Sequence, residues 1–158
     1  MSGRAHSRSG AALAALLLLA GTTAKVAAVQ MTGEAYISRT CSNGAAIRHA
    51  DDLASEAYAV NDSDRYFLAQ EAARQNWRCA HATDDSFTHD LARLEYASWY
   101  AKSFSTSYEF LQHAQEVYNI FDEVYVSSKD NQVRANAQRL REWFSAWMRR
   151  EKARVPSQ

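Results

Sequence analysis

The stretch from residue 45 to residue 155 contains neither glycine nor proline. Tight turns between β-strands depend on these residues, because glycine reaches positive φ angles and proline fixes the φ angle that many turns need. A β-rich domain of this length would carry several of them. Helices joined by short polar segments need few, so the sequence predicts an all-α fold.

The spacing of apolar residues agrees with this prediction. Five runs place apolar side chains mostly three or four residues apart, which puts them on one face of a helix. These runs are 47–58, 66–77, 87–104, 111–125 and 133–147. Short connections make consecutive helices antiparallel neighbours. We therefore expect about five antiparallel amphipathic helices, as a bundle or as a short helical-repeat array.

Polar residues that can accept hydrogen bonds from free backbone amides mark where these helices should begin. The expected starts are Asn43, Ser63, Asp85, Thr106, and Ser127 or Ser128. Thr106 is followed three residues later by Glu109, which is the capping-box pattern.

These starts recur along the chain. Asn43, Asp85 and Ser127 lie 42 residues apart, as do Ser63 and Ser105. Several residues match at the same offset, including the pairs Ala50–Ala92, Tyr58–Tyr100, Ala59–Ala101, Tyr66–Tyr108, Gln70–Gln112 and Ala72–Ala114. With alanine and tyrosine where helices would cross, residues 44–125 resemble tetratricopeptide-like repeats. The resemblance implies a repeat-type superhelix, although the period exceeds the roughly 34 residues usual in that family.

Cys41 and Cys79 are the only cysteines, so a single pairing is available. Cys41 precedes the first predicted helix and Cys79 lies near the end of the second. An antiparallel hairpin brings those two ends together, so we expect a disulfide in place of two buried free thiols.

Residues 1–28 have the three parts of a secretory signal peptide. Arg4 and Arg8 are followed by an uninterrupted apolar run at 11–20 and by small residues, and we expect cleavage after Ala28, with the small residues 22–24 as the second choice. A membrane anchor is the alternative, but it needs about 20 apolar residues. We expect 29–40 to be a lead-in segment, flexible or ordered on contact, and 41–155 to be one helical domain.

Export changes the net charge. Removal of Arg4, Arg8 and Lys25 leaves 15 basic and 18 acidic residues, a net charge of −3. Nucleic-acid binding needs a basic surface, so no nucleic-acid partner is expected. The signal peptide and the disulfide together predict a periplasmic or secreted protein.

One group of residues could bind a divalent metal: His81, Asp84, Asp85, His89 and Asp90. However, acids at the start of a helix commonly accept hydrogen bonds from its first amides, and we favour this capping role. Sequence motifs of serine hydrolases, zinc proteases and phosphate-binding loops are absent. The sequence therefore predicts no metal, no cofactor and no nameable catalytic residue.

Aromatic residues are denser in the third and fourth predicted helices than one buried face can hold. They either pack on other helices or line a groove for a partner. The last helix, within 131–154, carries seven basic residues. It either closes the bundle or lies on anionic lipid or an acidic partner. The residues assigned to a candidate partner surface are Tyr96, Trp99, Tyr100, Trp143, Arg149 and Arg150.

For the closing-helix interpretation, Leu140, Phe144 and Trp147 should be buried, and Arg139, Arg141 and Arg149 should lie off that face. The expected function is an exported helical module that binds a protein or peptide, in a narrower version a small inhibitor or immunity-type protein. The alternatives are an enzyme with an unrecognised carboxylate site and a protein that associates with membrane surfaces through 131–154.

Overall fold

The computed structural model describes residues 33–155, which form six α-helices and no β-strand. In chain order the helices are α2 (Gly33–Thr40), α3 (Gly44–Ala59), α4 (Arg65–Ala82), α5 (Ser86–Lys102), α6 (Ser107–Ser127) and α7 (Asn131–Arg154). The all-α prediction is confirmed in this part of the chain. The proposed signal peptide, residues 1–28, lies outside the described residues.

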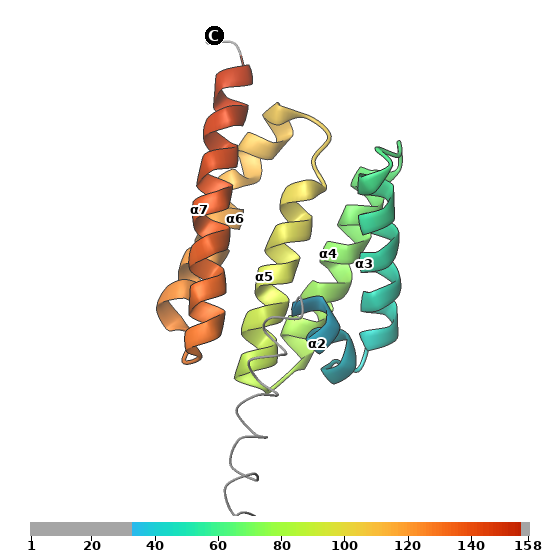
Figure 1. The fold of residues 1–158 in the computed structure, drawn as a ribbon, viewed down its shortest axis with the longest axis vertical. Helices are drawn as coiled ribbons and strands as arrows, with labels where there is room; N and C mark the ends of the chain where they lie inside the picture. The colour runs from blue at the N-terminus through green and yellow to red at the C-terminus, as the bar shows by residue number, and fades with distance from the viewer. Residues whose placement is uncertain (1–32, 156–158) are drawn as a thin grey trace, which may run out of the picture.

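Helices α3 to α7 run alternately up and down, so that each is antiparallel to the next (Figure 1). Helix α5 occupies the middle, with α3 and α4 on one side and α6 and α7 on the other (Figure 1). Helix α4 packs on α3 and α5, and α6 packs on α5 and α7. These are the five helices that the apolar spacing predicts.

Helix α2 was not predicted, because its eight residues lie in the expected lead-in segment. It packs across α3 and α5, and its Ile37 is fully buried. The approach is close because α3 begins with a glycine. A Cβ atom at Gly44 would lie 1.9 Å from the carbonyl oxygen of Ser38, so any larger residue there would push α2 away.

Cys41 and Cys79 form the predicted disulfide, and their Cα atoms are 5.6 Å apart, a normal separation for this bond. Cys41 lies in the corner between α2 and α3, and Cys79 lies in the last turn of α4. The bond therefore links the α2–α3 corner to the end of α4, at the open end of the α3–α4 hairpin. A sequence separation of 38 residues corresponds to about 3–4 kcal/mol of stabilisation in the chain-entropy model.

Two predicted helix starts are confirmed. The Asp85 carboxylate accepts a hydrogen bond from the Thr88 amide at 2.9 Å. The Thr106 hydroxyl accepts one from the Glu109 amide at 3.2 Å. Asn43 does occupy the N-cap position of α3 but makes no capping bond there.

Two other predicted helix starts were wrong by one to three residues. The N-cap of α4 is Asp64 and not Ser63. Helix α6 continues through Ser127, and Asp130 caps α7 by accepting bonds from two backbone amides. The first four N-caps, at 43, 64, 85 and 106, follow one another at intervals of 21 residues. Thus the 42-residue spacing relates the hairpins α3–α4 and α5–α6 but does not extend to α7.

Two clusters of buried side chains meet on α5. The larger cluster joins residues of all six described helices and includes Leu91 and Leu94 of α5. The smaller cluster consists of alanines of α3 and α4 packed around Trp99 of α5. Trp99 is only 3% exposed, so its assignment to a candidate partner surface was wrong. Its side chain fills the space that the short alanine side chains leave between the helices.

Helix α7 closes the bundle against α6 and, less extensively, α5. Phe144 is fully buried, with its ring 5.4 Å from Phe110 and 5.7 Å from Phe121. Leu140 and Trp147 are partly buried against the same cluster. Two of the three arginines expected off this face are exposed, Arg139 and Arg149.

Arg141 differs from those two arginines. Its guanidinium forms an ion pair with Asp122 of α6 and lies 4.3 Å from the centre of the Tyr125 ring. Its side chain is only 25% exposed. The Arg141 side chain therefore holds α7 against α6 and is not part of the exposed basic face of α7.

Replacement of Phe144 with alanine should lower the free energy of unfolding by about 3–5 kcal/mol, because it removes a fully buried ring and leaves a cavity. Urea unfolding followed by circular dichroism measures this loss. Phe67→Ala is the matched control: this phenylalanine is 69% exposed, and its loss should change stability by less than about 0.5 kcal/mol. Equal effects of the two changes would contradict the closing role of α7.

Candidate functional site

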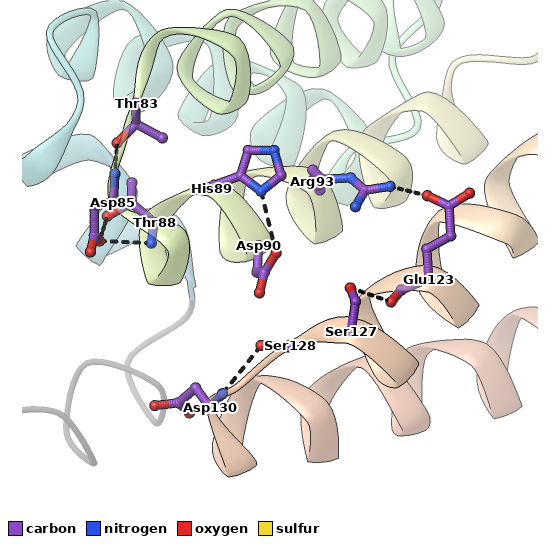
Figure 2. Close-up of polar contacts among 10 residues, drawn as sticks. All are labelled: Thr83, Asp85, Thr88, His89, Asp90, Arg93, Glu123, Ser127, Ser128 and Asp130. Atoms are coloured by element: carbon purple, nitrogen blue, oxygen red, sulfur yellow. Dashed lines mark hydrogen bonds and ion pairs between the residues drawn. The ribbon is translucent and has the colours of Figure 1, made fainter.

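The residues considered for metal binding lie between the last turn of α4 and the first turns of α5, and Figure 2 shows the contacts of Asp85, His89 and Asp90. Asp85 accepts hydrogen bonds from both the amide and the hydroxyl of Thr88. His89 lies 3.3 Å from the carboxylate of Asp90. Within residues 33–155, no group of three or more histidines, cysteines or acids is placed to hold a metal ion. Asp85 acts as a helix cap, as the sequence interpretation favoured.

The same region fastens α5 to the α6–α7 corner. Arg93 of α5 forms an ion pair with Glu123 of α6, and Ser127 donates a hydrogen bond to the Glu123 carbonyl oxygen (Figure 2). Beyond it, the Asp130 amide donates to the Ser128 hydroxyl. These contacts position helices, and we assign them a structural role.

The sequence-predicted partner residues do not form one surface. Tyr96 is partly buried against the smaller cluster, where its ring stacks on Tyr100 at 5.5 Å. Tyr100 lines a cleft, described below. Trp143 is 41% exposed on α7, and Arg149 and Arg150 are exposed near the end of that helix. None of these three α7 residues lines the cleft that contains Tyr100.

The largest surface hollow that we describe is a cleft of about 650 Å³ at the end of the bundle where α5 finishes. One wall is the first turns of α4, the other wall is the first turns of α6, and the floor is the last turn of α5 with the loop that follows. The lining residues are Tyr66, Phe67, Gln70, Tyr100, Ser103, Phe104, Ser105, Glu109, Gln112 and His113. We call it the α4–α6 cleft.

The aromatic rings of the α4–α6 cleft are ordered by contacts with one another. Phe104 stacks on His113, with ring centres 4.8 Å apart and planes within 6°. Tyr100 meets Phe104 edge to face at 5.0 Å, and its hydroxyl lies 3.1 Å from the His113 ring nitrogen. Phe67, at the rim, has no ring partner among the described residues and is 69% exposed. A large apolar ring is thus presented to solvent beside a floor of packed aromatic rings.

The two walls present residues at equivalent positions of the two hairpins. Gln70 and Gln112 are 42 residues apart, as are Phe67 and Glu109, and all four line the α4–α6 cleft. Neither glutamine side chain has a hydrogen-bond partner within residues 33–155, so both amides can bond to a ligand. The Glu109 carboxylate is held by the Ser105 hydroxyl at 3.1 Å. Phe67, Phe104, Glu109 and His113 were not predicted as site residues from the sequence, although the glutamines matched at 42 residues were a signal of the site.

A second, smaller cleft of about 310 Å³ adjoins the first and shares Tyr66, Phe104 and Ser105 with it. Its far wall is the end of α7. There the buried carboxylate of Glu151 accepts hydrogen bonds from Trp147, Ser107 and Arg154. These bonds satisfy the carboxylate and fix the end of α7 to the start of α6.

No helix within the described residues is both long enough and apolar enough to cross a membrane. The exposed side chains of α7 include Arg139, Trp143 and Arg150, whose spacing places them on one side of the helix. In the alternative interpretation, this side of α7 is the surface that would contact a membrane.

Two tyrosines at this end of the bundle have strongly raised pKa values. Burial, followed by the charge of Glu116, raises the pKa of Tyr100 to about 12. Burial, followed by the neighbouring Tyr66, raises the pKa of Tyr58 to about 12. The Tyr58 hydroxyl donates a hydrogen bond to the Lys102 carbonyl oxygen, which ties the end of α3 to the end of α5. Both phenols are therefore neutral at ordinary pH.

Comparisons with protein-family models, with curated proteins and with solved structures find no significant match to this chain. The resemblance to tetratricopeptide-like repeats consequently rests on the internal spacing alone.

The raised tyrosine pKa values predict a loss of stability in alkali. An unfolded tyrosine titrates near pH 10. The pKa values of Tyr58 and Tyr100 are higher in the folded protein, so the folded state binds these two protons more tightly than the unfolded state does. The resulting contribution to folding stability is fully present below pH 10 and is lost as the pH rises through about 12. Phenolate absorbance should show two or more of the eight tyrosines titrating near pH 12 while circular dichroism reports intact helices. Titration of all eight near pH 10 in the folded protein would contradict this.

Proposed function

We propose that this chain is an exported helical interaction module that binds a protein or peptide segment in the α4–α6 cleft. The observation that carries the proposal is the exposed ring of Phe67 beside the ordered rings of Tyr100 and Phe104. Partly exposed aromatic residues in a concave site commonly anchor protein partners. A volume of about 650 Å³ is also within the range of ordinary ligand pockets.

Polar groups in the walls fit a peptide better than an apolar small molecule. The amides of Gln70 and Gln112 can each donate and accept hydrogen bonds, and they come from opposite helices. A peptide backbone offers the complementary amide and carbonyl groups. We infer that the rings hold side chains of the partner while the glutamines hold its backbone.

Export is the second part of the proposal. The disulfide is compatible with an oxidising compartment, and the features of residues 1–28 favour a cleaved signal peptide. We therefore propose a periplasmic or secreted location. A narrower form of the proposal is an inhibitor or immunity-type protein that blocks a toxin or enzyme in that compartment.

The two alternatives require other features. An enzyme acting through paired carboxylates needs two acids in one site, and within the described residues the α4–α6 cleft is lined by one, Glu109. Association with an anionic membrane would use Trp143 and the arginines of α7. That alternative predicts that the partner surface lies on α7 and not in the cleft.

Peptides selected from a random displayed library against the oxidised protein should bind in the cleft. Phe67→Ser should weaken their binding at least about tenfold, because it removes an aromatic anchor. Binding constants from fluorescence anisotropy test this. Val126→Ser is the matched control, since Val126 is 71% exposed on α6 and lies outside the cleft. Binding that is insensitive to Phe67→Ser but lost with Trp143→Ser would contradict the proposal and favour α7.

A further inference from the structure

We propose that the α4–α6 cleft takes a basic side chain, a lysine or arginine of the bound segment, placed against the aromatic rings and beside the Glu109 carboxylate. This inference rests on the proposed function and deepens it, because it names the chemistry of the partner group that the cleft accepts.

The aromatic rings of the α4–α6 cleft can attract a cation. The face of an aromatic ring attracts a cation, and the cleft draws such rings from two helices and a loop: Tyr66 and Phe67 from α4, Tyr100 from α5, and Phe104 from the loop after α5. His113 covers one face of Phe104. Phe67 has no ring contact within residues 33–155, so its faces remain accessible. A cation entering the cleft would meet the exposed face of Phe67.

The charge of the cleft wall also favours a basic group. Glu109 is exposed in the wall, and no lysine or arginine lines this cleft within the described residues. Glu116 of α6 does not line the cleft, but its carboxylate oxygen lies 3.4 Å from the hydroxyl of Tyr100, which does. Its negative charge acts on Tyr100 in the same direction as burial and raises the pKa of that phenol. A basic group is therefore attracted to the cleft and an acidic group is repelled.

The protein's own cations at this end of the bundle already lie on aromatic rings. The Arg65 guanidinium lies 4.3 Å from the centre of the Tyr66 ring and donates hydrogen bonds to backbone carbonyls of the α3–α4 turn. Lys102 lies 4.3 Å from the Trp99 ring. Neither residue lines the α4–α6 cleft, and Glu109 makes no ion pair within residues 33–155, so its charge is available to a partner cation.

The test compares two probes of nearly the same shape, one with a charged guanidinium and one with a neutral urea group. N-acetyl-arginine amide and its neutral analogue N-acetyl-citrulline amide are titrated into the oxidised protein, and amide chemical shifts are followed by NMR. The arginine probe should shift signals of Phe67, Tyr100, Phe104 and His113, and it should bind about threefold to tenfold more tightly than the citrulline probe. Added salt should reduce this ratio.

Glu109→Gln should bring the ratio close to one, because it removes the charge and keeps an oxygen that can accept from Ser105. Glu142→Gln is the control, since Glu142 is an exposed acid on α7 and should leave the ratio unchanged. Equal binding of both probes, or shifts confined to other surfaces, would overturn the inference. Selected peptides that depend on Phe67 but tolerate arginine-to-citrulline replacement would overturn it while leaving the proposed function intact.

Discussion

The burial of α5 on two sides is the constraint on which the rest of the structure depends. Leu91 and Leu94 point into the cluster shared with α6 and α7, while Trp99 enters the alanine-rich cluster of α3 and α4. Every residue of α5 after Ser86 is buried or partly buried, and the other helices are arranged to cover it. Movement of α5 would open both clusters at once, so its position is fixed.

The α4–α6 cleft is a consequence of where α5 ends. Tyr58 holds the last carbonyl of the helix, which fixes the last turn of α5 with Tyr100 and the start of the loop that contains Phe104. The flanking walls come from equivalent turns of two hairpins. Their difference, Phe67 on one wall and Glu109 on the other, gives the cleft both an apolar and an acidic side.

The features predicted correctly from the sequence are those that local chemistry determines. Apolar spacing located five helices, side-chain chemistry located the caps at Asp85 and Thr106, and the hairpin geometry paired the cysteines. Helix α2 was missed because it depends on tertiary contacts, the burial of Ile37 and the close approach at Gly44. Trp99 was misassigned because spacing shows that a residue lies off one buried face and does not show that a second face of the same helix is also covered.

The most direct test of the central claim is amide hydrogen exchange, measured on the oxidised protein with and without a peptide that it binds. If the α4–α6 cleft is the partner site, added protection will appear within residues 66–70 and 100–113, and α7 will exchange as it does in the free protein. Protection confined to residues 131–154, with unchanged exchange at the cleft, would contradict the account and transfer the interaction to the basic helix.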